Sequence, residues 1–176
     1  MMNQIILAGF GGQGILSMGH FIAHAGLLDG KNVSWLPSYG PEKRGGTANC
    51  SVCISDEPIG SPLVLTPDIL IAMNQPSFDK FIGAAKPGAK VFIDSTLIDA
   101  ACDRTDVEIF AIPSSQMADD NELKGGSNII LLGKLLKETE LFSLDTMKKA
   151  IEKVVPPSKA HLIANNFKAI ELGMNA

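Results

Sequence analysis

The fold of this chain is decided by residues 5–14, which read IILAGFGGQG. The apolar run 5–8 has the continuous character of a strand buried on both faces, and apolar side chains recur at helical spacing after it. A glycine turn between a strand and a helix lets a ligand approach the backbone and points free N–H groups at an anion. The stretch therefore predicts an α/β fold with a ligand-binding turn at Gly11, Gly12, Gln13 and Gly14.

Short apolar runs and helical patterns alternate along the rest of the chain. Strands are predicted at residues 5–8, 33–36, 47–55, 68–73, 91–94 and 107–112. Helices are predicted from 15 to a stop at Gly30, from Pro76 to Pro87, and over 128–138, 144–155 and 158–172, with Ser143 as an N-cap and Gly173 as the last stop. Residues 37–46 and 114–127 are expected to be loops, the second with no more than one helical turn.

This order predicts one domain over residues 1–176 with a three-layer, Rossmann-like architecture. The expected sheet is mixed but mostly parallel, with helices on both faces and a helical C-terminal part. Residues 47–55 are expected to add the antiparallel strand.

Composition narrows the class of protein. Apolar residues make up 45% of the 176 residues, charged residues 19%, and the net charge is −4, which gives no electrostatic footprint for nucleic acid. The apolar runs are too short to span a membrane. Three cysteines do not form a disulfide framework, so a cytoplasmic location is expected.

A dinucleotide site is the first alternative for the glycine turn, because Gly9, Gly11 and Gly14 fit the pattern G-x-G-x-x-G. Such a site needs an acidic residue at the end of the second strand to hold the ribose hydroxyls. Neither Asp nor Glu occurs between Lys31 and Pro41. An autonomous protein that binds NAD or FAD therefore remains only a distant alternative.

A second special loop, SYGPEKRGG over residues 38–46, follows the second strand. In an open α/β sheet it would lie at the same edge as the glycine turn. Arg44 can pair with a carboxylate or a phosphate through two hydrogen bonds, and glycines flank the charged residues. The predicted recognition residues of this loop are Ser38, Tyr39, Glu42, Arg44, Gly45 and Gly46.

Other candidate sites are weaker. Cys50 and Cys53 lie three apart on an extended segment, so their sulfurs should point to opposite faces and bind no metal together. Asp94 ends a strand, but no nucleophile–base set accompanies it, and no catalytic residue is predicted. Residues 124–128 could receive an anion at a helix start, or Ser127 could simply cap that helix.

Taken together, GFGGQG, WLPSYGPEKRGGTANCSVCIS and SDEPIGSP resemble the gamma subunit of 2-oxoacid:ferredoxin (acceptor) oxidoreductases. The second loop is similar to that of the 2-oxoglutarate and 2-oxoisovalerate members, except that Lys43 stands where Met is expected. The similarity extends to residues 68–75, 128–133 and 165–173.

This resemblance implies oxidative decarboxylation of a 2-oxoacid, foremost 2-oxoglutarate, to acyl-CoA and CO2, with electrons passed to ferredoxin or another acceptor. Thiamine diphosphate and iron–sulfur clusters would belong to the alpha, beta and ferredoxin-like delta subunits, and this chain alone would bind no cofactor. The two loops would lie at subunit interfaces and close to coenzyme A (CoA). The isolated chain would be inactive and could form a homodimer, and the 2-oxoisovalerate and pyruvate enzymes are the alternatives.

Overall fold

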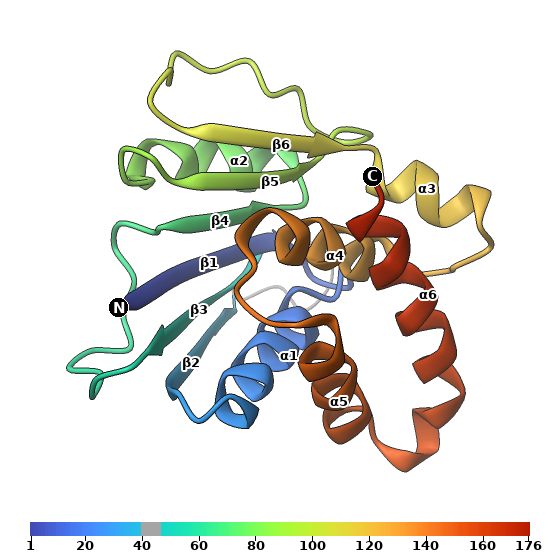
Figure 1. The fold of residues 1–176 in the computed structure, drawn as a ribbon. Coiled ribbons are helices and arrows are strands. Elements are labelled where there is room, and N and C mark those ends of the chain that lie inside the picture. The colour runs from blue at the N-terminus through green and yellow to red at the C-terminus, as the bar shows by residue number, and fades with distance from the viewer. Residues whose placement is uncertain (40–46) are drawn as a thin grey trace.

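The computed structural model describes residues 1–39 and 47–176. These residues form a six-stranded sheet in the order β2-β3-β1-β4-β5-β6 (Figure 1). Its strands are β1 (Met2–Phe10), β2 (Asn32–Tyr39), β3 (Thr47–Ser55), β4 (Ile69–Ala72), β5 (Lys90–Asp94) and β6 (Glu108–Ile112). Strands β1, β4, β5 and β6 pair in parallel, whereas β3 runs antiparallel to both β1 and β2. The predicted mixed, mostly parallel sheet is confirmed.

Two strands extend several residues beyond their predicted ranges, for different reasons. In β1 only residues 5–8 pair with β4 as well as β3, and all four are buried, so the apolar run marks only the part of the strand with two neighbours. Strand β2 continues through Pro37 to Tyr39, where a loop was expected. Proline lacks an N–H donor, but β2 is an edge strand with one partner, and such positions tolerate proline.

Helices cover both faces of the sheet, as predicted. Ile5 and Leu7 of β1 pack with α1 (Ile15–Leu28), α4 (Ser127–Thr139) and α5 (Leu144–Val154) in one apolar cluster. Ile6 and Ala8 point the other way and pack in a second cluster with α2 (Gln75–Phe81) and the 3₁₀ turn η1 (Ile82–Ala84). In Figure 1, α1, α4 and α5 lie in front of the sheet and α2 lies behind it.

Local signals place several helix ends correctly. Gly30, at φ +71°, follows α1, and the bonds Gly30 N–H to Leu27 O and Lys31 N–H to Gly26 O close the helix end. The Ser143 side chain caps α5 by accepting from Thr146 N–H.

The C-terminal part differs from the prediction in three places. Residues 114–127, expected as a loop, contain α3 (Ser114–Asp120), and the predicted last helix is divided into a 3₁₀ segment η2 (Pro157–Leu162) and α6 (Ile163–Met174). Gly173 does not stop α6 but lies inside it. A Cβ at Gly173 would lie 1.7 Å from Ile130 O, so this glycine lets α6 approach α4 closely.

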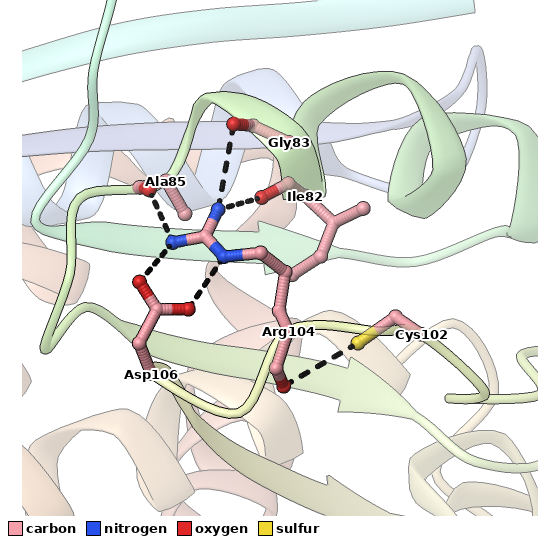
Figure 2. A network of polar contacts seen from close by, with 6 residues as sticks. All are labelled: Ile82, Gly83, Ala85, Cys102, Arg104 and Asp106. Atoms are coloured by element: carbon pink, nitrogen blue, oxygen red, sulfur yellow. Dashed lines mark hydrogen bonds and ion pairs between the residues drawn. The ribbon is translucent and has the colours of Figure 1, made fainter.

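Arg104 links η1 to the segment before β6, near the amino ends of β5 and β6 (Figure 2). Its guanidinium donates to the carbonyl oxygens of Ile82 (3.0 Å), Gly83 (3.4 Å) and Ala85 (2.9 Å), at the end of η1. The carboxylate of Asp106 accepts from Nε (2.6 Å) and Nη2 (2.9 Å) and raises the pKa of Arg104. All these partners belong to the chain itself, so Arg104 has a structural role.

Candidate functional site

The glycine turn after β1 is held by the side chain of Gln13. Its Oε1 accepts from Phe10 N–H (2.7 Å), and its Nε2 donates to Met73 O (2.9 Å), directly after β4. A backbone bond from Gln13 N–H to Phe10 O (3.2 Å) completes the turn. Gln13 was predicted to bind a ligand, but both ends of its side-chain amide form hydrogen bonds that fix the turn to the neighbouring strand.

Packing accounts for two glycines of this stretch, and backbone conformation for a third. A Cβ at Gly9 would lie 2.6 Å from Gln13 Oε1, and one at Gly14 would lie 2.3 Å from Asn128 Nδ2. Gly12 differs, because it has φ +95° but no atom within 4 Å of the position that a Cβ would take. Gly12 is thus the exposed tip of the turn, open on its outer side.

Two helix starts meet behind this tip. Gly14 is the N-cap of α1 and Gly126 is the N-cap of α4, and no side chain caps either helix. Asn128 Nδ2 donates to Gly14 O (3.1 Å) and so fixes one helix start against the other. Uncapped first-turn N–H groups carry partial positive charge and attract anions.

The second predicted loop leaves the sheet at the same edge. Tyr39 of β2 and Gly9 of β1 both pair with Ala48 of β3, so the two strands end level with each other. Ser38 is exposed on β2. Glu42, Arg44, Gly45 and Gly46 lie outside the described residues, so their predicted roles stay predictions.

A pocket of about 290 Å³ lies beside the glycine turn. Gly12, Gln13 and Met73 form one side, and Ser115, Asp119, Ser127 and Asn128 contribute to the other. A second pocket of about 360 Å³ lies beyond Asn128 and is lined by His20, Lys159 and Asn166, among others. Asn128 and Gly125 line both pockets.

Asp94 organises the α3 and α4 side of the first pocket. This carboxylate is fully buried at the carboxyl end of β5 and accepts from Thr96 N–H, Ser115 N–H and the hydroxyls of Ser115 and Ser127. Ser127, considered as a helix cap, therefore directs its hydroxyl to Asp94 instead. The start of α3 therefore already binds an anionic group, the carboxylate of Asp94.

The cysteines take structural positions, as predicted. Cys50 belongs to the apolar cluster on the α1 side and Cys53 to the cluster on the α2 side, so they point to opposite faces of the sheet. Burial raises the pKa of the Cys50 thiol to about 12, which keeps it protonated. Within residues 1–39 and 47–176, no three His, Cys, Asp or Glu side chains gather to hold a metal ion. None of the helices described is long and apolar enough to cross a membrane.

The strand order speaks against a dinucleotide site. In dinucleotide-binding folds the second strand lies directly beside the first, and its acidic end faces the ribose. Here the antiparallel β3 lies between β1 and β2 and places Ala48 beside Gly9. Strand β2 itself contains no acidic residue.

Comparison with known families agrees with this geometry. The model of the family described as "Pyruvate ferredoxin/flavodoxin oxidoreductase" matches residues 4–176. The chain belongs to this family. The resemblance to gamma subunits is also confirmed, because the gamma subunit of a keto/oxoacid ferredoxin oxidoreductase from Geobacter sulfurreducens superimposes with a TM-score of 0.84 at 29% identity, covering 99% of this chain and 95% of that chain.

Other relatives in the oxidoreductase family differ in length. The 2-oxoglutarate synthase subunit KorC of Methanocaldococcus jannaschii is 40% identical over 89% of this chain and 85% of its own length. The ketoisovalerate oxidoreductase subunit VorA of Methanothermobacter thermautotrophicus is 39% identical over 97% of this chain but only 35% of its own length. This chain thus spans about a third of VorA. A structure of 2-oxoglutarate:ferredoxin oxidoreductase from Magnetococcus marinus, with 2-oxoglutarate, coenzyme A and succinyl-CoA bound, has a TM-score of 0.86 at 29% identity, covering 99% of this chain and 30% of that chain.

Sequence reasoning missed how the family's glycine turn is surrounded. It did not predict that Asn128 would donate to Gly14, 114 residues away, or that Asp94 would accept hydrogen bonds from Ser115 and Ser127. The available signal was modest: an aspartate at a strand end and serines at two helix starts. Both gain meaning only when the sheet order is known.

Proposed function

We propose that the chain is the gamma subunit of a 2-oxoacid:ferredoxin oxidoreductase that converts 2-oxoglutarate and CoA to succinyl-CoA and CO2, with electrons passed to ferredoxin or another acceptor. The similarity to KorC over most of both chains supports 2-oxoglutarate. The similarity to VorA favours 2-oxoisovalerate as the second candidate. Activity of the assembled complex with 2-oxoglutarate, 2-oxoisovalerate and pyruvate decides between the substrates.

In this proposal the chain has no catalytic residue of its own. Thiamine diphosphate and iron–sulfur clusters supply the decarboxylation and electron-transfer chemistry in the alpha, beta and ferredoxin-like delta chains. Residues 1–176 act as one domain that supports assembly, and the free cysteines suit a cytoplasmic complex in which thiols stay reduced. We expect the isolated chain to be inactive and to form a homodimer through the surface that its partners otherwise cover.

One observation carries the proposed role towards CoA: the uncapped start of α1 faces the open tip at Gly12, beside the 290 Å³ pocket. A phosphate of CoA there would receive the N–H groups of the first turn. The start of α4 contributes less, because the buried carboxylate of Asp94 lies nearby. Strand β2 ends at the same edge, and we propose Arg44, in the segment that follows it, as a second phosphate ligand.

Co-expression tests the assembly role. A tagged copy of this chain is expected to recover the alpha, beta and delta chains, and a complex prepared without it is expected to lose activity. Arg44→Ala tests the CoA role, with an expected rise of about tenfold in the KM for CoA, equivalent to about 1.4 kcal/mol. Lys43→Met, the residue that the family resemblance leads us to expect there, is the matched control and should leave the KM unchanged. Normal assembly and an unchanged KM in Arg44→Ala would refute the proposed CoA contact.

A further inference from the structure

The 290 Å³ pocket has one wall whose serine hydroxyls have no proton free for a ligand. Ser115 and Ser127 line it, and both hydroxyls donate to Oδ2 of the fully buried Asp94. The hydroxyl oxygens of Ser114 and Ser127 are 3.0 Å apart, so a hydrogen bond between them extends the network. The hydroxyl protons are therefore held inside the cluster, and the oxygens keep lone pairs for the pocket.

Further acceptors lie on the same wall. Asn128 is 6% exposed, its Nδ2 donates to Gly14 O, and its Oδ1, which is itself buried, has no partner among the described residues. The amide orientation is fixed by the bond to Gly14, so the oxygen side remains an acceptor. Asp119 adds an exposed carboxylate at the rim. The side chains of this wall suit hydrogen-bond donors, whereas the opposite side, at Gly12 and the start of α1, suits an anion.

A carboxylate is required at position 94 for this arrangement. Thr96 N–H donates to Oδ1 (3.0 Å) and Ser115 N–H donates to Oδ2 (3.2 Å), so backbone donors occupy both oxygens. Asparagine offers only one acceptor oxygen, so its NH2 group would face one of these N–H groups. The displaced amide would also release the serine hydroxyls, which could then donate into the pocket.

We propose that this wall binds an amide or amino group of the ligand, and that Asp94 sets this preference by holding the hydroxyl protons of Ser115 and Ser127. The inference rests on the proposed function, in which the ligand is CoA, because CoA carries amide groups in its pantetheine chain and phosphates beside them. Asp94 is thus a positioning residue that acts through two serines. It directs the donor-bearing part of the ligand to the α3 and α4 side and leaves the phosphates to the glycine turn.

The test uses the assembled complex and two inhibitors that separate the two chemistries. Pantetheine carries amide donors without phosphate, and inorganic pyrophosphate carries charge without amide donors. In Asp94→Asn, the inhibition constant of pantetheine should rise about tenfold, equivalent to about 1.4 kcal/mol, while that of pyrophosphate should stay equal or fall. Ser127→Ala keeps the carboxylate and should weaken pantetheine by a few fold, leaving pyrophosphate unchanged.

Asp106→Asn is the matched control, because it makes the same change at an exposed carboxylate that pairs with Arg104, near the amino ends of β5 and β6 and away from the pocket (Figure 2). It should lower the melting temperature without changing either inhibition constant. Equal weakening of pantetheine and pyrophosphate in Asp94→Asn, or no change in Ser127→Ala and Asp94→Asn, would overturn the inference. If Asp94→Asn does not fold, Ser115→Ala and Ser127→Ala decide the question by the same criterion.

Failure of this inference and failure of the proposed function are distinguishable. If Gly12→Asp weakens CoA relative to Gly12→Asn but Asp94→Asn does not separate the two inhibitors, the CoA site stands and the role of Asp94 falls. If Gly12→Asp and Gly12→Asn also bind CoA equally well, both the role of Asp94 and the proposed CoA contact are refuted.

Discussion

Gly12 offers a direct test of the charge that the glycine turn receives. It has φ +95°, and a Cβ there would meet nothing within 4 Å, so a side chain would project from the open tip of the turn. Asn and Asp tolerate positive φ better than other residues and have the same size. Gly12→Asn and Gly12→Asp therefore share the backbone strain and the steric effect, and they differ by one charge.

The expected magnitude follows from Coulomb's law. At a separation of about 8 Å and an effective dielectric constant of about 40, two unit charges repel by about 1 kcal/mol, or roughly fivefold in affinity. CoA carries several phosphate charges, so fivefold is the lower expectation for the ratio of KM values, Asp over Asn. The ratio should shrink as salt is added, because exposed charges are screened over about 8 Å at physiological ionic strength.

Stability should change in the opposite direction. An aspartate close to the start of α1 meets the positive end of the helix dipole and gains about 0.3–1 kcal/mol. We therefore expect Gly12→Asp to be at least as stable as Gly12→Asn in urea denaturation while it binds CoA more weakly. Equal KM values for the two variants at low and high salt would refute the placement of an anion at this turn.

Three further predictions concern the framework of the site. Gln13→Met removes the bonds to Phe10 N–H and Met73 O, each contributing about 1 kcal/mol, so urea denaturation should show a loss of about 2 kcal/mol, and an unchanged midpoint would contradict the role of Gln13. Gly173→Ala places a Cβ 1.7 Å from Ile130 O and should cost about 3 kcal/mol, whereas Gly83→Ala, with nothing within 4 Å, should stay within about 0.5 kcal/mol; equal melting temperatures would refute the close helix contact. Arg104 lowers the pKa of Asp106, so this carboxylate stabilises the fold above the unfolded-state pKa of about 3.9, and the contribution is lost as the pH falls through the lower folded-state value. The difference in melting temperature between wild type and Asp106→Asn should therefore be present at neutral pH and vanish in acid, and a difference that grows in acid would contradict the ion pair.

Local chemistry made much of the fold predictable. Some signals depend only on residues a few positions away, and each of these is found where the sequence predicted it. They are the strand–glycine–helix stretch, the Ser143 cap and the Gly30 stop. The antiparallel strand Thr47–Ser55 was also predicted with the observed bounds. The alternation of strands and helices was sufficient for the fold class.

The errors occur where a residue's meaning depends on a distant neighbour. Gly173 has the appearance of a helix stop but is required by the backbone of α4. Pro37 has the appearance of a loop start but is tolerated because β2 has only one neighbour. In both cases, the residue is compatible with more than one local structure, and tertiary packing selects one.

The same division applies to the site. The position of the glycine turn, and the ending of β1 and β2 at the same edge, followed from the general rule for α/β sheets. The inward role of Gln13 and the cluster around Asp94 did not, because their partners lie on other elements. Met73 lies 60 residues from Gln13, and Ser127 lies 33 residues from Asp94.

Amide hydrogen exchange of the assembled complex, with and without CoA, tests the central claim most directly. The account predicts that CoA slows exchange at Gly11–Gly14 and at the first turn of α1, while the amides around Arg104 and Asp106, at the opposite edge of the sheet, stay unchanged. Protection that is absent from the glycine turn and the start of α1, in a complex that demonstrably binds CoA, would contradict the account.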